Sequence, residues 1–291
     1  MDRTKYIGGS DIAAIMLMSR WQTPLGVWAE KTGKVINKLN IDTPEYVQLG
    51  MELEEFVAMK FTQATGKKVR RDSRNFTHPQ FPYMQGHIDR RVTGTDEILE
   101  CKTCSAWKEK EWLGEDIPQE YIMQLMWYLG LTKSSKGYLA VLIGGQKFIW
   151  KEVMFDQELF DKMVITAEIF WKEFVQKDVQ PMACGDDNAT LFELFPTSDI
   201  DKAITFEGDE ETEVNQLLEA RAAGIQAKKE ISEEIAECDA KLKQKLGTAE
   251  KGQTGQYSFT WKLQNRKEYT VAATSMRVLR CVDNTKKRGK A

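Results

Sequence analysis

The sequence of 291 residues predicts an α/β fold in which helices flank a mixed central sheet. Two observations predict this fold class. Residues 44–65 and 118–131 place apolar side chains at helical spacing, whereas residues 83–102 and 138–153 are rich in strand-forming residues. Within the last segment, Gly144-Gly145-Gln146 separates two apolar runs, which is a hairpin signal. Helices and strands that alternate along a chain pack as layers around one core.

Composition restricts the class of protein. Hydrophobic residues make up 42% and charged residues 29%, which is typical of globular proteins. No apolar run approaches the roughly 20 residues that cross a membrane, and the start lacks the apolar core of a secretory signal. Five cysteines form no disulfide framework in a chain of this size, so we expect a cytoplasmic protein without membrane contact. Because the net charge is −3, binding to nucleic acid requires local basic clusters.

The first part of the chain is predicted to be helical. Ser10 is the expected N-cap of a helix over 11–16, and a second helix covers 24–31. A third helix covers 44–65 and ends at Gly66. Spacings of three and four residues place one set of its side chains on a single face: Val47, Met51, Glu54, Ala58 and Phe61.

The middle of the chain is predicted to form the sheet. Strands are expected over 68–75, 83–92 and 98–102, and a turn over 93–96 joins the last two. The hairpin over 138–153 completes the sheet. A helix over 156–176 follows and presents an apolar face to the core.

After Pro196 the composition becomes acidic, and a separate extension is predicted. Residues 211–246 read as one long amphipathic helix. A small hairpin is expected between 257–263 and 268–271, before a basic tail. We therefore divide the chain into a domain over 1–197 and an extension over 198–291, whose helix either folds back on the domain or contacts another chain.

The residues that indicate chemistry lie on the second and third predicted strands. Glu100 and Lys102 are two apart and so point to one face, whereas Cys101 points to the other. A hairpin brings Asp89 beside Glu100. Two converging carboxylates form a hard-oxygen site for Mg²⁺ or Mn²⁺, which supports metal-assisted phosphodiester hydrolysis. The alternative is a surface strand with a simple Glu–Lys pair.

Two further residues favour the functional interpretation. Glu54 lies on the apolar face of its helix, where a carboxylate needs a partner or a metal. Gln124 lies between Tyr121 and Tyr128 on one face of the helix that follows the strand.

Together these residues resemble the PD-(D/E)xK nuclease superfamily, and more narrowly the YqaJ-type phage recombinase nucleases, to which phage lambda exonuclease is related. The matching segments are Ile7-Gly8-Gly9-Ser10-Asp11-Ile12-Ala13-Ala14-Ile15, Trp21-Gln22-Thr23-Pro24, Gly50-Met51-Glu52-Leu53-Glu54, Gly86-His87-Ile88-Asp89, Leu99-Glu100-Cys101-Lys102-Thr103 and Tyr121-Ile122-Met123-Gln124-Leu125. Ile88 stands where the motif has proline. The resemblance implies a restriction-endonuclease-like sheet.

The resemblance also implies roles for the predicted site residues. Asp89 and Glu100 bind the metal with the carbonyl oxygen of Cys101, and Glu54 completes the shell, through water or at a second metal. Lys102 orients or deprotonates the attacking water. Gln124 holds either Lys102 or that water in place. Only burial could lower the lysine pKa beside carboxylates, so we favour orientation and charge stabilisation.

A second site is implied at the N-terminus. The resemblance places Arg3 and Ser10 around the 5′-phosphate of a DNA end. His87, two residues before Asp89, either adds a donor to the same phosphate or only packs in the protein. The alternative is that Ser10 only caps a helix and Arg3 is solvated. The basic residues of 67–74 and the tryptophans at 107 and 112 are weaker candidates for DNA contacts.

The resemblance implies an Mg²⁺-dependent exonuclease that degrades one strand of linear double-stranded DNA 5′ to 3′. The remaining 3′ overhang would serve a phage single-strand-annealing protein in recombination. Relatives form ring-shaped trimers, so we expect a homo-oligomer, encoded by a phage or prophage and acting in the bacterial cytoplasm. The alternatives are a PD-(D/E)xK endonuclease, and a non-catalytic DNA-end or recombination scaffold that acts through residues 211–291.

Overall fold

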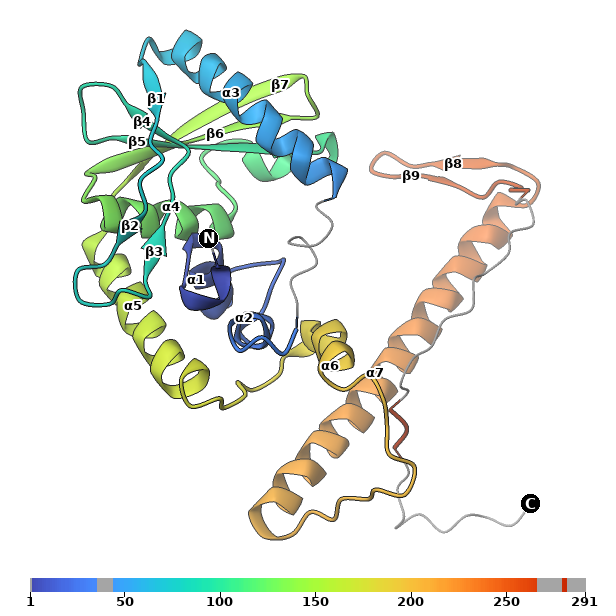
Figure 1. Ribbon diagram of the computed structural model, residues 1–291. Helices are drawn as coiled ribbons and strands as arrows, with labels where there is room; N and C mark the ends of the chain where they lie inside the picture. Colours follow the sequence, from blue (N-terminus) through green and yellow to red (C-terminus); the bar gives the residue numbers. More distant parts are fainter. Residues whose placement is uncertain (1, 36–43, 266–278, 282–291) are drawn as a thin grey trace. The chain divides into compact units, whose positions relative to one another are not determined.

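The computed structural model describes residues 2–35, 44–265 and 279–281. The chain divides into two compact units, Met1–Pro196 and Thr197–Ala291 (Figure 1). We refer to them as the N-terminal unit and the C-terminal unit. No helix in the described residues is long and apolar enough to cross a membrane.

The N-terminal unit is built on a five-stranded mixed sheet, as predicted. Its order is β1-β4-β5-β6-β7, in which only β5 and β6 run parallel. The strands of this sheet are β1 Val69–Arg71, β4 Arg90–Val92, β5 Ile98–Cys104, β6 Lys136–Ile143 and β7 Lys147–Met154. Two short strands, β2 Phe76–Thr77 and β3 Gln85–Gly86, pair separately.

Helices cover both faces of the sheet. The α-helices of this unit are α1 Gly9–Ile15, α2 Pro24–Lys31, α3 Glu45–Thr65, α4 Gln119–Thr132, α5 Gln157–Ile169 and α6 Asn188–Leu194. Shorter helical turns are η1 Arg3–Lys5, η3 Ala106–Trp112 and η5 Gly185–Asp187, and a π-helical turn, η4 Phe170–Val175, extends α5. The predicted helices over 24–31, 44–65, 118–131 and 156–176 are confirmed.

The two faces of β6 show how the layers pack. Tyr138 and Ala140 lie in a buried cluster with Phe61 of α3, whereas Leu139 and Val141 lie in a larger cluster with Leu125 of α4. Figure 1 shows α3 and α4 on opposite sides of the sheet. A strand buried on both faces is apolar throughout, which explains the continuous run of apolar residues in β6.

Two details of the predicted helices are wrong. The first helix begins at Gly9 with Gly8 as its N-cap, because the Asp11 carboxylate accepts the Gly8 N–H at 2.8 Å. Ser10 is therefore inside the helix and is not its cap. In α3, Met51 is 58% exposed and the buried residues begin at Val57, so the core face is narrower and starts later than predicted.

The predicted strand over 83–92 is also wrong, since it breaks into β3 and β4. Residues 87–89 lie between the two strands. At this break the Asp89 carboxylate, rather than a backbone carbonyl, accepts the Cys101 N–H at 2.7 Å. The interruption frees the Asp89 backbone from the ladder and turns its side chain to β5.

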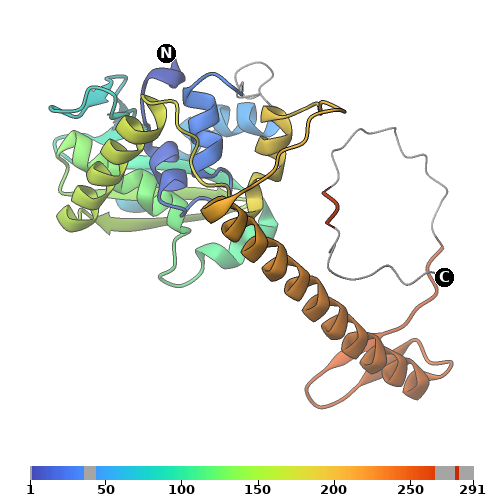
Figure 2. The same ribbon diagram turned by 90° about the horizontal axis from the view of Figure 1, so that it is seen from below.

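The C-terminal unit contains one long helix, α7 Gly208–Leu246, which Figures 1 and 2 show as uninterrupted. The predicted helix over 211–246 is confirmed. Within the described residues of this unit, no residue of α7 is buried. In the described residues, β9 Ser258–Thr260, which lies within the predicted strand over 257–263, pairs with β8 Lys251–Gln253. Residues 268–271 and the basic tail lie outside the described residues.

Candidate active site

The paired strands β4 and β5 bring the predicted acids and the lysine together. Arg90 pairs with Leu99 across the two strands, so the preceding Asp89 lies beside Glu100. On the same face, Lys102 Nζ donates to Glu100 Oε1 at 2.7 Å. Cys101 packs in the cluster beneath α3 on the opposite face, as strand alternation predicts.

Helix α4 supplies the fourth member of this group. Lys102 Nζ donates to Gln124 Oε1 at 2.9 Å, and Gln124 Nε2 donates to the Tyr128 hydroxyl at 3.0 Å. The Tyr121 ring also faces Lys102, with its centroid 5.2 Å from Nζ. The ammonium group is thus held between a strand carboxylate and a helix amide. We refer to Asp89, Glu100, Lys102 and Gln124 as the catalytic cluster.

Electrostatics in the catalytic cluster favour a bound cation. Burial and the nearby Asp89 carboxylate raise the pKa of Glu100 to about 8. Burial also raises the pKa of Asp89. For Lys102, burial alone would lower the pKa, but the Glu100 and Asp89 carboxylates outweigh burial and raise it. The lysine is therefore protonated at neutral pH, and the two acids lack enough positive charge around them.

The chemistry of these donors fits a divalent metal ion. Glu100 Oε2 is buried and has no hydrogen-bond partner within residues 2–35, 44–265 and 279–281. An unsatisfied carboxylate oxygen beside a second carboxylate suits a hard cation such as Mg²⁺. No group of three or more His, Cys, Asp or Glu side chains in the described chain forms a metal site. Asp89 and Glu100 are therefore the two carboxylates that the described chain brings together here, and the further ligands predicted from the sequence are the Cys101 carbonyl oxygen and Glu54.

Glu54 has a different partner from the predicted metal. The Arg90 guanidinium donates to Glu54 through Nη1 and to Glu55 through Nη2, the latter at 3.0 Å. The Arg90 side chain is only 3% exposed. A buried arginine needs such carboxylate partners. Glu54 lies near enough to oppose ionisation of Glu100, but its role as a metal ligand stays a prediction.

The structure also brings Arg3 and Ser10 together. Arg3 Nη2 donates to Ser10 Oγ at 3.1 Å, although Ser10 is inside α1 and not at its cap. The Asp11 carboxylate points away into the protein, where it accepts from Lys31 Nζ at 2.7 Å. Lys31 Nζ also donates to the Arg3 carbonyl oxygen at 2.8 Å. This buried pair anchors the N-terminal segment.

Glycines in the motifs allow these segments to reach α4. A Cβ at Gly9 would lie 2.9 Å from both Gln124 Cγ and Tyr128 Cε1. A Cβ at Gly86 would lie 2.9 Å from Tyr128 Cδ1. Since real Cβ atoms do not approach so closely, both backbones pack on α4 only because they lack a side chain.

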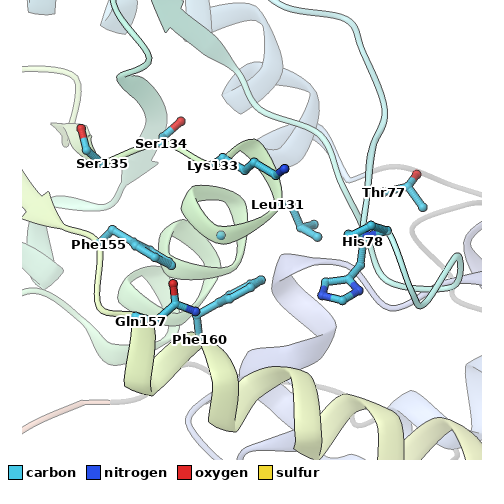
Figure 3. A pocket seen from close by; sticks show the side chains of 11 residues that line it. Thr77, His78, Leu131, Lys133, Ser134, Ser135, Phe155, Gln157 and Phe160 are labelled. Atoms are coloured by element: carbon cyan, nitrogen blue, oxygen red, sulfur yellow. The ribbon is translucent and has the colours of Figure 1, made fainter.

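A cleft of about 890 Å³ joins the Arg3–Ser10 pair to Lys102 and Gln124 of the catalytic cluster, whereas Asp89 and Glu100 are not among the described residues that line it. The residues that line it include Arg3, Ser10, Trp21, Val47, Lys102 and Gln124. A second hollow of about 600 Å³ lies between the end of α4, the start of α5 and residues 77–79 (Figure 3). His78, Lys133 and Phe160 line this hollow, and its described lining contains no carboxylate. We therefore place the candidate active site in the first cleft.

Several other candidates lie elsewhere. His87 is exposed between β3 and β4 and is not among the described residues that line the cleft. Trp112 is buried and stacks on Tyr121 at 5.5 Å, so it is a packing residue. Most of the basic run is paired with acids: Lys67 with Glu97, Arg71 with Glu55, and Arg74 and Arg91 with Asp72.

Comparison with known proteins identifies the family of this chain. Residues 1–135 match the YqaJ-like viral recombinase domain. The chain is 36% identical over 267 residues to the uncharacterized protein YqaJ of Bacillus subtilis (strain 168), covering 90% of this chain and 82% of that protein. The chain belongs to the YqaJ family.

Solved structures support the same fold for this family member. The alkaline exonuclease LHK-Exo of Laribacter hongkongensis matches with a TM-score of 0.52 at 17% identity, over 61% of this chain and 91% of that chain. LHK-Exo in complex with dAMP matches with the same TM-score at 18% identity and the same coverage. At such identities the likeness concerns the fold, which is the predicted sheet flanked by helices.

Sequence reasoning missed residues that support the site from outside the motifs. Neither Arg90 nor Lys31 is among the site residues that the sequence motifs predict. Both are buried cations that hold acids beside the cleft. In the sequence, two features point to these residues. Lys31 lies at the end of the predicted helix over 24–31, and Arg90 directly follows Asp89.

Proposed function

We propose that the protein is an Mg²⁺-dependent exonuclease that degrades one strand of linear double-stranded DNA in the 5′ to 3′ direction. The 3′ single-stranded overhangs would enter phage-type single-strand-annealing recombination. The observation that carries the proposal is the catalytic cluster, in which the buried Glu100 and the half-buried Asp89 lie beside a charged lysine, Lys102, that lines the cleft. Membership of a viral recombinase family and the alkaline exonuclease fold support the nuclease part.

Asp89 and Glu100 would hold the metal, with the Cys101 carbonyl as a further ligand. A bound Mg²⁺ supplies Lewis acidity toward the phosphate and lowers the pKa of a bound water. Glu100 Oε2 is the oxygen of this chain that most needs such a partner, since the described residues leave it without one. Glu54, held by Arg90, adds negative charge beside the metal site.

Lys102 acts as a positive charge and not as a base in this mechanism. Because its pKa is raised by Glu100 and Asp89 beyond the effect of burial, it keeps its proton at neutral pH. Two of its N–H groups donate to Glu100 and Gln124 among the residues described, and an ammonium has three. The third is available to a phosphate oxygen or to the attacking water. Lys102 thus orients the water and stabilises charge on the pentavalent phosphate.

The proposed polarity depends on Arg3 and Ser10. A guanidinium and a hydroxyl 3.1 Å apart offer several donors to a terminal phosphate. Both line the cleft that contains Lys102, so a DNA end with a 5′-phosphate can occupy both groups. His87 as a further phosphate donor remains a prediction from the sequence.

The test is nucleotide release from a linear duplex with 5′-phosphate or 5′-hydroxyl ends, with and without Mg²⁺. We expect release that requires Mg²⁺ and is faster with the phosphate. Lys102→Ala should lower kcat by about 10²–10³-fold, the typical loss when one preorganised donor is removed. Lys147→Ala is the matched control, because Lys147 is exposed and pairs only with Glu109 among its described ion pairs.

Two results would favour other functions. Comparable cutting of closed circular DNA would indicate an endonuclease. A scaffold would be indicated by two results together. Asp89→Ala would keep full recombination activity, and deletion of 211–291 would remove it. The scaffold deserves this test because the apolar side chains of α7 are unburied in the described chain. We also infer an annealing partner and a homo-oligomer, such as a ring trimer, which light scattering can measure.

A further inference from the structure

The cleft has an exposed aromatic side chain that the proposed catalytic steps do not use. Trp21 is 64% exposed and lines the same cleft as Arg3, Ser10 and Lys102. An exposed aromatic ring inside a cleft offers a large, rigid surface on which a ligand can pack. Because Trp21 lines the same cleft as the proposed phosphate-binding pair, one ligand can contact both.

The segment that carries Trp21 is fixed by hydrogen bonds and ion pairs. The backbone N–H of Trp21 donates to Ser19 Oγ at 3.1 Å. The neighbouring Arg20 contacts Glu111 of η3 and Glu120 of α4, each at 2.7 Å. Glu120 is mostly buried, with 8% of its side chain exposed. The indole is therefore held at the cleft and is not exposed through a loose loop.

A cation already lies over the indole ring. Lys108 Nζ is 3.9 Å from the ring centroid of Trp21, within the range of a cation–π contact. Such a contact orients the ring and adds positive charge beside it. An oriented aromatic ring next to basic side chains is the arrangement by which proteins stack nucleobases without reading their sequence.

The other tryptophans near the cleft differ from Trp21. Trp112 is buried, so no ligand can stack on it. Trp107 is 94% exposed, but it is not among the described residues that line the cleft. Trp107 therefore serves as a matched control: it is an exposed tryptophan on the adjacent η3 turn that lacks the position of Trp21.

We propose that Trp21 is a stacking platform for a nucleobase at the end of the DNA. The base lies on the indole while Arg3 and Ser10 bind the terminal phosphate. This inference rests on the proposed function for its substrate, and it adds a base-binding site that accepts any of the four bases. The platform would hold the end in place and would not take part in phosphodiester cleavage.

The test uses linear duplexes that carry 2-aminopurine at the 5′-terminal position, at the opposite 3′-terminal position or in the middle. Binding is measured without divalent metal, so that no cleavage is possible. We expect the wild-type protein to quench a terminal probe and Trp21→Phe to retain part of the quenching. Trp21→Ala should lose it and bind the duplex about 5- to 150-fold more weakly, whereas Trp107→Ala should behave as wild type.

Three outcomes would overturn the proposal. They are unchanged terminal quenching and affinity in Trp21→Ala, an equal loss in Trp107→Ala, and Trp21-dependent quenching only at the middle position. Circular dichroism of each variant separates these outcomes from misfolding, and Trp21→Phe provides a second, conservative variant. If the wild type binds DNA ends and degrades them but Trp21 has no effect, the nuclease proposal stands and the platform fails. If the wild type binds no DNA end, both fail.

Discussion

Replacing Lys31 by methionine should destabilise the N-terminal unit strongly, because it leaves a buried carboxylate without its cation. Lys31 and Asp11 have side chains that are 1% and 2% exposed, and their charged groups are 2.7 Å apart. After the substitution, the Asp11 carboxylate still accepts the Gly8 N–H at 2.8 Å, and its nearest remaining cation is the Arg3 guanidinium at 3.8 Å. Breaking a buried pair from one side typically costs about 3–5 kcal/mol.

For a unit of this size, each kcal/mol lowers the melting temperature by about 2–4 °C, so the expected decrease is about 6–20 °C. The buried Trp28 and Trp127 report unfolding of this unit by fluorescence. The double variant Asp11→Asn/Lys31→Met removes both charges and should recover about 1–3 kcal/mol relative to Lys31→Met. The preference for 5′-phosphate ends should also fall, since Lys31 holds the Arg3 backbone.

The reasoning would be refuted by a loss below about 1 kcal/mol in Lys31→Met, smaller than any buried pair broken from one side. The single variant Asp11→Asn completes the comparison. The reasoning would also be refuted if the losses of unfolding free energy in Lys31→Met and Asp11→Asn simply added in the double variant, because the two side chains would then act independently. Lys34→Met is the matched control. Lys34 pairs with Asp178 at 2.8 Å, but this pair is exposed and should change stability by about 1 kcal/mol or less.

Two further predictions concern stability. Hydrogen bonds from Arg74 and Arg91 hold the pKa of Asp72 well below its usual range, so Asp72→Asn should be less stable than the wild type at pH 7. That difference should shrink as the pH falls below about 4, where the unfolded carboxyl protonates, and a constant difference in urea midpoints down to pH 2 would contradict it. Gly130→Ala should lower the urea midpoint, because a Cβ there would lie 2.1 Å from Phe160. The overpacking should cost about 1–3 kcal/mol of unfolding free energy, which exceeds the gain of about 0.5–1 kcal/mol from replacing a helical glycine by alanine. An unchanged urea midpoint would contradict this prediction and would show that the Phe160 side chain can move aside.

The sequence predicted the parts of the site that depend on local periodicity. Strand alternation placed Glu100 and Lys102 on one face, and helical spacing placed Gln124 beside Tyr128. Both inferences require only the geometry of a single element, and short-range backbone geometry is fixed by sterics. The parallel pairing of β5 and β6, which the sequence analysis does not name, agrees with the helix that connects them.

The sequence did not predict features that depend on contacts between distant segments. Gly8 rather than Ser10 caps α1, because Asp11 bonds to Gly8 and also to Lys31, twenty residues away. Glu54 pairs with Arg90, thirty-six residues away. The identity of a charged partner in the interior depends on the complete fold, and a list of spacings along one chain does not contain it.

The close approach of α1 to α4 has a consequence for the products of the proposed enzyme. Gly9 leaves no room for a side chain between these helices, and its neighbour Ser10 is one of the two residues that would grip the terminus. The proposed phosphate-binding pair and the Lys102–Gln124 pair are thus joined through the packing of the Gly9 backbone on the Gln124 and Tyr128 side chains. A fixed spacing between the two pairs would bring the same phosphodiester bond to Lys102 at every turnover, so the released fragments should be uniform in size. A bulkier residue at position 9 should change this spacing and make the fragment lengths less uniform.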